Sequence, residues 1–290
     1  MSIEADEFTC YFMHSPHFLP TLAAIFFFMS YTPPAIRQVN IVRYVTPLRE
    51  GGSLPAIVEA DDDFLYVAKF RGAGQGTKAL IADLIGAELA RAIGLKVPEL
   101  VLADLDEAFG RTEPDEEIQD LLKFSTGRNL GVHYLSGAIS FDPVVNEIDA
   151  LTASKIVWLD ALLTNVDRTA KNTNMLIWNR ELWMIDFGAC LYFHHSWDNW
   201  EQSAQSPFAN IKSHVLLAKA SQLAEVDEPL KATITPALLT TILQSIPDDW
   251  LRGHGTPDEM RQVYHEFLSR RIANSNVFLK TAQDARATLI

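Results

Sequence analysis

The sequence predicts an α+β protein with a small β-rich N-terminal lobe and a larger, mainly helical C-terminal lobe. Three observations predict this class. Short β-branched and aromatic runs, separated by Gly, Pro and Asp turn residues, fill residues 39–70. A long apolar helix pattern and then a short hairpin pattern span residues 143–186. Helical periodicity dominates the chain from residue 207 onward.

The first lobe should contain a small antiparallel sheet followed by one amphipathic helix. Apolar residues recur at helical spacing from Leu80 to Ile93, and Gly94 stands where a glycine commonly ends a helix. A further strand is predicted in residues 97–105. The acid-rich residues 104–120 indicate a solvated loop and short helix that joins the two lobes.

The second lobe should begin with a strand pair in residues 132–141 and a long helix over residues 143–163. More helices are predicted in residues 213–223, 235–246 and 259–289, several of which open with Ser, Thr or Asp. The chain shows no internal repeat and no low-complexity tract.

Composition is that of an ordinary globular protein, since 48% of the 290 residues are apolar and 21% are charged. Acidic residues outnumber Lys and Arg by 37 to 24, and the net charge of -13 disfavours nucleic-acid binding. The two cysteines, Cys10 and Cys190, form no C-x-x-C pair, which argues against a disulfide framework and a zinc knuckle. We therefore expect a cytoplasmic protein.

An apolar stretch lies near the N-terminus. Its uninterrupted part, residues 22–29, is much shorter than the roughly 20 residues that cross a bilayer. Acidic residues precede it where a signal peptide carries basic ones, so we expect neither secretion nor membrane association. Residues 1–38 are expected to be an N-terminal extension, either disordered or reflecting a wrongly assigned start, with Met1 or Met29 as the natural first residue.

Asp167, Asn172 and Asp186 form the constellation that carries chemistry. Asp167 and Asn172 have the spacing D-x-x-x-x-N, in which the aspartate accepts a substrate proton and the asparagine binds Mg²⁺. A hairpin over residues 174–185 then delivers Asp186 in the sequence IDFG, as a second metal ligand. Each motif alone is common, and the alternative interpretation is three turn or cap residues. Their pairing across a hairpin favours magnesium-dependent phosphoryl transfer from ATP.

Lys69, in the strand sequence VAKF, is the candidate clamp for the ATP phosphates. An exposed lysine at a strand end is also commonplace. The following helix should supply an acid that orients Lys69, and it offers Asp83 and Glu88. The two acids are five residues apart and do not share a helix face, so only one should reach Lys69. We choose Asp83, although Glu88 has the longer reach.

Two glycine clusters compete as the loop that covers the phosphates. Gly51, Gly52 and Ser53 lie between the first two strands, where backbone N–H groups can approach phosphate without Cβ interference. The cluster GAGQGTK, residues 72–78, opens a helix and has the wrong order and spacing for a Walker A loop. We assign the first cluster as the principal loop and the second as a flexible link whose polar residues could touch phosphate.

Other motifs argue little. His194 and His195 have no carboxylate-rich ligand set beside them, which disfavours a metal site there. No G-x-S-x-G motif and no Ser, His and Asp cluster indicates a hydrolase. The six tryptophans are interpreted mostly as packing residues.

The run NVDRTAKN, the hairpin, the IDFG turn and QGTKALIADLIGAELARAIGLKVPE together resemble the HipA-like kinases. The resemblance covers about residues 39–195 and implies a two-lobed, protein-kinase-like fold that also resembles phosphatidylinositol kinases. It implies ATP- and Mg²⁺-dependent phosphorylation of Ser or Thr in a protein substrate. It also implies a nucleotide-clamping lobe over residues 39–110 and a catalytic lobe over residues 111–290.

Departures from the family pattern limit what is carried over. Asn165 and Val166 precede Asp167, where the usual loop has His and Arg. The residues before Val39 are too few for the N-terminal subdomain of the long family members, so a short stand-alone relative is expected. A toxin role and an antitoxin-like partner are therefore not inferred. Ser53 is the candidate for inhibitory autophosphorylation that the resemblance implies. Asp83 is shorter than the usual glutamate, which predicts looser pairing with Lys69.

Two further functions stay open beside the protein kinase. A pseudokinase or interaction module would bind nucleotide without transferring phosphate, and a small-molecule kinase or nucleotidyl transferase would use another acceptor. The acceptor and the oligomeric state have no readable code in the sequence.

Overall fold

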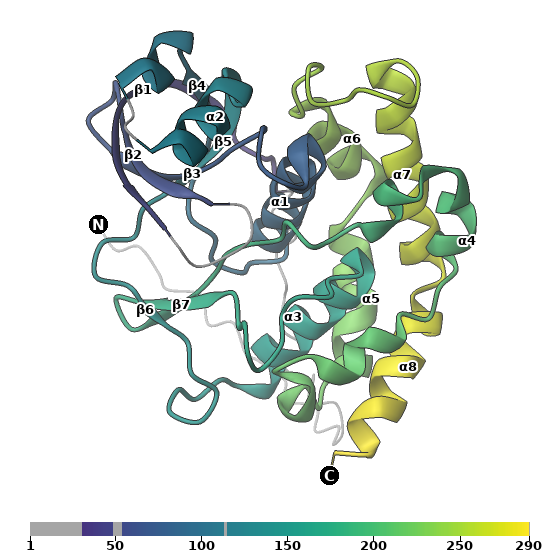
Figure 1. The fold of residues 1–290 in the computed structure, drawn as a ribbon. Helices are drawn as coiled ribbons and strands as arrows, with labels where there is room; N and C mark the ends of the chain where they lie inside the picture. Colours follow the sequence, from purple (N-terminus) through teal and green to yellow (C-terminus); the bar gives the residue numbers. More distant parts are fainter. Residues whose placement is uncertain (1–30, 49–53, 113–114, 290) are drawn as a thin grey trace, which may run out of the picture. The chain divides into compact units, whose positions relative to one another are not determined.

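A β-rich N-terminal part and a mainly helical C-terminal part make up the computed structural model, which describes residues 31–48, 54–112 and 115–289 (Figure 1). This confirms the α+β class. Residues Tyr31–Ile290 form one compact unit. Within the described stretches, no helix combines the length and apolar character needed to cross a membrane.

The main strands and helices follow one another along the chain. They are β1 (Arg37–Pro47), β2 (Ala56–Ala60), β3 (Leu65–Lys69), α1 (Gly76–Ala92), β4 (Leu100–Leu105), α2 (Glu116–Phe124), β5 (Gly127–His133), β6 (Ile139–Ser140), α3 (Ala150–Leu163), β7 (Met175–Trp178), β8 (Glu181–Met184), α4 (Trp200–Ala204), α5 (Leu223–Thr233), α6 (Pro236–Gln244), α7 (Pro257–Ala273) and α8 (Ser275–Ala287).

The N-terminal sheet closes into a barrel in the order β1-β2-β3-β5-β4. Its strands pair antiparallel except for β1 and β4, which run parallel and complete the closure. Along β2, Ala56, Val58 and Ala60 alternate inward and are buried, as expected for a strand with one face on a core. The small antiparallel sheet predicted from sequence is therefore a closed barrel with a core of its own.

Two predictions for residues 104–141 are wrong in detail. The acid-rich residues 104–120 were expected to join two lobes, but they link β4 to β5, which are neighbouring strands of the barrel. The strand pair predicted in residues 132–141 does not form. Its first two residues end β5, and the short β6 pairs with β7 instead. The division at residue 110 stays a prediction, although β5 belongs to the barrel beyond that point.

Helix bounds in the C-terminal part also differ from those predicted. The helix expected from residue 143 begins at Ala150, because Asp149 caps it by accepting from the Thr152 N–H. Residues 213–223 form no α-helix of their own: they lie between the 3₁₀ turn Ala209–Ser213 and the start of α5 at Leu223, with a second 3₁₀ turn, Leu217–Lys219, in between. The last predicted helix breaks at Asn274 into α7 and α8.

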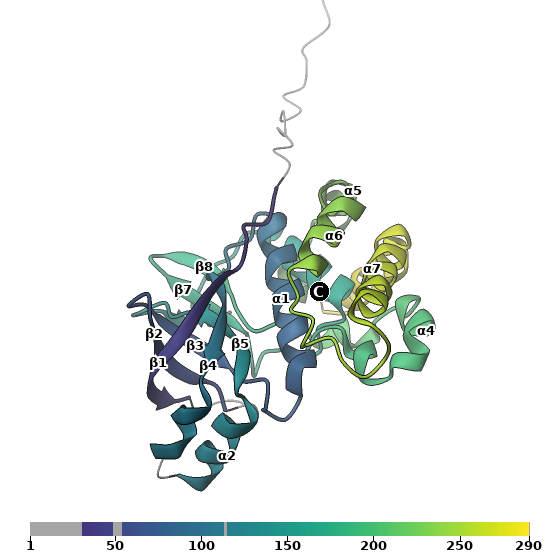
Figure 2. The same cartoon turned by 90° about the horizontal axis from the view of Figure 1, so that it is seen from above.

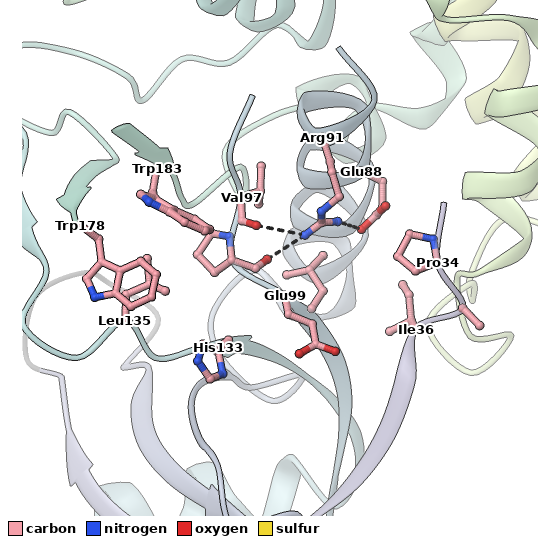
Figure 3. Close-up of a pocket in the computed structure, with 13 residues that line it drawn as sticks. Pro34, Ile36, Glu88, Arg91, Val97, Glu99, His133, Leu135, Trp178 and Trp183 are labelled. Atoms are coloured by element: carbon pink, nitrogen blue, oxygen red, sulfur yellow. Dashed lines mark hydrogen bonds and ion pairs between the residues drawn. The ribbon is translucent and has the colours of Figure 1, made fainter. Parts of the chain in front are cut away.

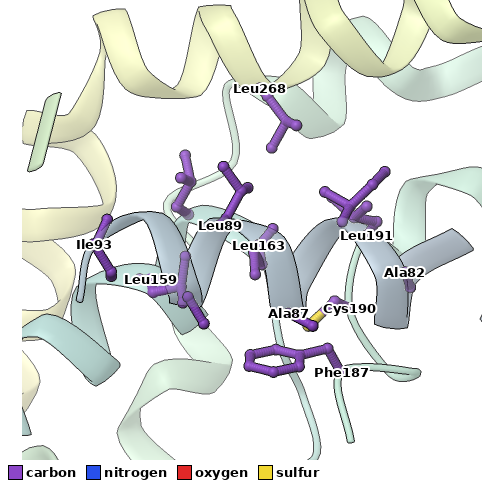
Figure 4. Packing of buried hydrophobic residues seen from close by; sticks show 14 of the residues in the cluster. Ala82, Ala87, Leu89, Ile93, Leu159, Leu163, Phe187, Cys190, Leu191 and Leu268 are labelled. Atoms are coloured by element: carbon purple, nitrogen blue, oxygen red, sulfur yellow. The ribbon is translucent and has the colours of Figure 1, made fainter. Parts of the chain in front are cut away.

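Helix α1 lies between the barrel and the helical part (Figure 2) and is buried along most of its length. Figure 4 shows its apolar side chains, including Leu89 and Ile93, against Leu159 and Leu163 of α3 and against Phe187. A helix that is apolar on nearly every side needs partners all round, which these neighbours supply. This packing fixes the helix that carries the candidate acids.

Gly86 makes the closest of these approaches. A Cβ placed on Gly86 would lie 2.5 Å from the Cβ of Phe187, which is closer than two side-chain carbons can come. The space that a side chain would fill on α1 is therefore occupied by the ring of the IDFG phenylalanine.

Gly86→Ala is expected to destabilise the protein by about 1–3 kcal/mol, because the new methyl group must displace Phe187. Denaturant unfolding measures the change. Phe187→Leu in the same chain should recover little of the loss, because leucine keeps the Cβ and Cγ atoms that the new methyl group meets first. Equal stability of Gly86→Ala and wild type would show that α1 and Phe187 are not packed this closely.

Candidate nucleotide and phosphoryl-transfer site

Lys69 joins β3, α1 and the IDFG turn at one point. Its Nζ donates to Asp83 Oδ2 at 2.7 Å and to Asp186 Oδ1 at 2.8 Å. The side chains of Lys69 and Asp83 are 15% and 5% exposed, whereas that of Asp186 is 44% exposed. The structure thus brings together three residues that the sequence placed on separate elements. The looser pairing expected of the shorter Asp83 is not observed.

Electrostatics within this cluster differ between its two acids. Burial is the largest influence on Asp83 and raises its pKa to about 6, although Lys69 opposes the change. Burial lowers the pKa of Lys69, but Asp186 and Asp83 outweigh it and raise that pKa above its usual range. The Lys69 cation in turn lowers the pKa of Asp186. At neutral pH one cation therefore faces two carboxylates, which leaves surplus negative charge for a metal ion.

The IDFG turn is held to α1 by its backbone. The Phe187 N–H donates to Asp83 Oδ1 at 2.6 Å, so the two oxygens of Asp83 bind the lysine and the turn. Asp186 has φ 54°, in the left-handed region that a non-glycine residue seldom adopts. This conformation is maintained by the contacts on either side of the turn, and it directs Asp186 toward Lys69.

The loop after α3 arranges the candidate catalytic base. Asp167 Oδ2 accepts from Asn172 Nδ2 at 2.7 Å and from Asn174 Nδ2 at 3.2 Å. The Asp167 N–H donates to Asn165 Oδ1 at 3.0 Å. The D-x-x-x-x-N spacing therefore closes into a tight loop in which Asp167 and Asn172 touch.

Asp160, which the sequence did not indicate, supports this loop through buried hydrogen bonds. Its side chain is fully buried and accepts from Arg168 Nε at 2.5 Å and from Asn165 Nδ2 at 2.8 Å. His214 Nε2 lies 2.9 Å from the same carboxylate. Because the Leu216 N–H donates to His214 Nδ1, the ring proton is on Nε2 and points to Asp160. Three donors thus satisfy the buried charge.

Arg168 extends this support to the IDFG turn. Its Nη1 donates to the carbonyl of Asn174 at 2.6 Å and approaches that of Ile185, just before Asp186, at 3.4 Å. Burial alone would raise the pKa of Asp160, but Arg168 and His214 hold it below its ordinary value. The loop with Asp167 and the turn with Asp186 therefore share one buried ion pair.

Other sequence candidates fall elsewhere. Gly51, Gly52 and Ser53 lie outside the described residues, so their assignment stays a prediction. Glu88, the alternative partner for Lys69, is buried and pairs instead with Arg91 and the Tyr31 hydroxyl.

Glu88 and Arg91 face a separate cavity of about 340 Å³ beside the C-terminal half of α1 (Figure 3). Trp178 and Trp183 form its opposite wall, and Arg91 donates to the backbone carbonyl of Pro98 at its rim. Lys69, Asp83, Asp167 and Asp186 do not line this cavity.

The sequence analysis missed the residues that support the loop. Asp160, His214 and Asn174 carry no motif, and contacts across 54 residues, as between Asp160 and His214, leave no local pattern. Arg168 was visible only as the residue after Asp167. A buried acid in an otherwise apolar helix was the one available signal, because such an acid needs partners.

The donor set fits magnesium that is also held by nucleotide phosphates. No cluster of three or more His, Cys, Asp or Glu residues suited to a metal occurs in the part of the chain that the structure describes. Mg²⁺ is commonly bound through one or two carboxylates plus substrate phosphates, so such a cluster is not required. Asp186 Oδ2 and Asn172 Oδ1 are the hard oxygen ligands available, since Asp186 Oδ1 accepts from Lys69 and Asn172 Nδ2 donates to Asp167.

Comparison with known proteins gives the family of the chain. A family model described as HipA-like kinase matches residues 41–280. The chain therefore belongs to the HipA-like kinase family, and with it to the phosphotransferases. Membership implies use of ATP and, usually, of a divalent metal. Among curated proteins, none matches the chain.

The fold is also similar to that of the Helicobacter pylori proinflammatory kinase CtkA. The TM-score is 0.50 at 12% identity, over 87% of this chain and 99% of that chain. At this identity the likeness shows a kinase-like fold and nothing of the substrate.

Asp160→Ala is expected to destabilise the protein by about 3–5 kcal/mol, because it leaves the buried Arg168 cation without its partner. Denaturant unfolding of wild type and variant measures this. The exposed pair of Lys280 and Asp284 supplies the control, and Asp284→Ala should cost less than about 1 kcal/mol. Equal costs for the two variants would contradict the anchoring role of Asp160.

The raised pKa of Asp83 predicts an acidic limit for nucleotide binding. As pH falls through about 6 the carboxyl gains a proton and no longer holds Lys69 by charge, so affinity for Mg²⁺-ATP should drop. The nucleotide titrates equally in wild type and Asp83→Asn, so the ratio of their Kd values isolates this side chain. We expect a ratio near one below pH 6 and a growing ratio above it. A ratio independent of pH would refute the assignment.

Proposed function

We propose that this protein is a Mg²⁺-ATP-dependent kinase that phosphorylates Ser or Thr of a protein. The observation that carries the proposal is the contact of Lys69 with both Asp83 and Asp186, at 2.7 and 2.8 Å. A lysine so placed can bind phosphate while one acid orients it and the other binds metal. A buried cation between two acids is costly to fold, which favours a functional role for this cluster.

Asp167 is proposed as the catalytic base. Asn172 and Asn174 both donate to its Oδ2, which leaves Oδ1 to accept the proton of an attacking hydroxyl. The side chain is partly exposed, so an acceptor can reach it. Asn165 and the buried Asp160 hold the loop so that this oxygen keeps its direction.

Asn172 and Asp186 are proposed as the Mg²⁺ ligands. When bound, magnesium neutralises charge on the transferred phosphoryl group. Lys69 keeps its proton across the physiological range because its pKa lies above the usual value. On nucleotide binding, Lys69 would retain Asp83 and turn its remaining donors toward the phosphates.

A macromolecular acceptor is supported by the surface beside the base. Val166, next to Asp167, and Tyr192 are large apolar side chains that are 38% and 58% exposed. The backbone N–H of Leu191 donates to the carbonyl of Leu163, which ties the segment of Tyr192 to the end of α3 from which Val166 follows. Exposed apolar groups next to a base suit a polypeptide better than a small polar metabolite.

Asp167→Asn and Asp186→Asn are each expected to reduce transfer from γ-labelled ATP by about 100-fold or more, since general base catalysis and metal binding are both lost. Incorporation into the protein itself or into peptide libraries is the measurement. Asp198→Asn, which changes an exposed acid outside the site, should keep wild-type activity. Transfer retained in both site variants would sink the proposal.

Intact mass and thermal shift separate the remaining functions. A phosphate adduct supports the kinase, whereas an AMP adduct would identify a nucleotidyl transferase. A thermal shift with Mg²⁺ and ATP but no γ-phosphate transfer to any acceptor would identify a pseudokinase. Either of the last two outcomes would replace the proposal.

A further inference from the structure

The loop between α6 and α7 reaches from the helical part to the barrel. Asp249 Oδ2 accepts from Arg71 Nη1 at 2.5 Å, and the Asp249 carbonyl accepts from Arg71 Nη2 at 3.2 Å. Arg128 of β5 forms a second ion pair with the same carboxylate, at 3.1 Å. The side chains of Arg71 and Asp249 are 17% and 18% exposed, so water screens the pair only partly.

Trp250 adds two hydrogen bonds beside this ion pair. Its side chain is 1% exposed, and its Nε1 donates to the carbonyl of Arg128 at 3.0 Å. Its own carbonyl accepts from Thr77 Oγ1, in the first turn of α1, at 2.9 Å. One short loop therefore forms hydrogen bonds with β5, with the segment after β3 and with the start of α1.

The first turn of α1 lacks the usual capping interactions. Gln75, at the N-cap position, makes no side-chain cap hydrogen bond, and the first turn has no acid. The preceding GAGQG segment is held at its beginning, where the Gly72 N–H donates to Ser125 Oγ at 3.2 Å, and it ends at Gly76 with φ 62°. A helix that follows such a link is positioned by contacts, and at this end Trp250 supplies one through Thr77.

These contacts lie in the sequence between Lys69 and Asp83, the two residues of the proposed nucleotide clamp. Arg71 lies two residues after Lys69, and Thr77 lies six residues before Asp83. The separation of Lys69 Nζ and Asp83 Oδ2, 2.7 Å, depends on how β3 and α1 lie relative to each other. The loop of Asp249 and Trp250 makes hydrogen bonds to Arg71, just after β3, and to Thr77, in the first turn of α1.

We infer that Asp249 and Trp250 are positioning residues, which hold α1 against β3 so that Asp83 orients Lys69 for the ATP phosphates. The inference rests on the proposed function, because it assigns the clamp to nucleotide binding. It gives the glycine-rich GAGQGTK segment a role as a flexible link that the loop of the helical part sets in place. Neither residue touches the reacting groups.

Asp249→Asn tests the inference. If loss of the ion pair leaves the first turn of α1 in its observed position in about one tenth of the molecules, the Kd and KM for Mg²⁺-ATP should rise about tenfold. The kcat at saturating ATP should change much less, since nucleotide binding restores the docked state. Asp249→Glu, which keeps the charge, should recover much of the affinity.

Asp248→Asn is the matched control. It makes the same change at the neighbouring position, but Asp248 pairs with Arg261 of α7 within the helical part. We expect its nucleotide affinity and its α1 to match wild type. An equal loss of affinity in Asp248→Asn and Asp249→Asn would overturn the inference by showing that any change in this loop acts alike.

Hydrogen exchange of α1 without nucleotide gives a readout independent of the proposed function. The amides of α1 should exchange faster in Asp249→Asn than in wild type or Asp248→Asn, while those of α7 should not differ. Unchanged exchange in α1 would overturn the inference even if the protein is an active kinase. A wild type that binds no nucleotide would overturn the proposed function, while exchange would still decide whether Asp249 holds α1.

Thr77→Val keeps the test decisive if Asp249→Asn does not fold. It removes only the hydroxyl that donates to the Trp250 carbonyl, and a single hydrogen bond corresponds to about a two- to tenfold effect on docking. Faster exchange at the start of α1 supports the inference. Exchange identical to wild type would contradict it.

Discussion

The candidate catalytic centre depends on one buried carboxylate, that of Asp160. A charge without solvent is tolerated only when donors surround it, and Arg168, Asn165 and His214 do so here. Asn165 and Arg168 lie on either side of Asp167 in the sequence, so their bonds to Asp160 hold the Asp167 loop from both sides. Removal of Asp160 would therefore affect geometry as well as stability.

Local patterns predicted the first four strands of the barrel, α1, the hairpin, and α3, α6, α7 and α8, but they missed β5, α4 and α5. They could not predict closure of the barrel, because the parallel pairing of β1 with β4 joins segments about sixty residues apart. Helix starts were misplaced where a cap such as Asp149 overrode an apolar pattern that began earlier. The break at Asn274 falls where this one residue leaves helical backbone angles, with φ -112° and ψ 35°.

The sequence predicted those residues of the candidate site that belong to short motifs. Spacing indicated Asp167, Asn172 and Asp186, and the order of elements indicated Lys69, which the structure brings to Asp83 and Asp186. Asp83 was preferred to Glu88 from the sequence, and the contact of Lys69 with Asp83 agrees with that choice. Tertiary packing decides which face of the helix meets β3. Their chemical roles remain proposals.

The choice of aspartate at position 83 has a structural consequence. An aspartate is one methylene shorter than the glutamate usual at this place, so α1 must lie closer to β3 for the same contact with Lys69. Gly86 allows the same helix to approach the IDFG turn, since a Cβ there would lie 2.5 Å from that of Phe187. The α6–α7 loop bonds Arg71, after β3, and Thr77, at the start of α1. Lys69 therefore meets both acids because α1 is held close to β3 and to the turn at separate points.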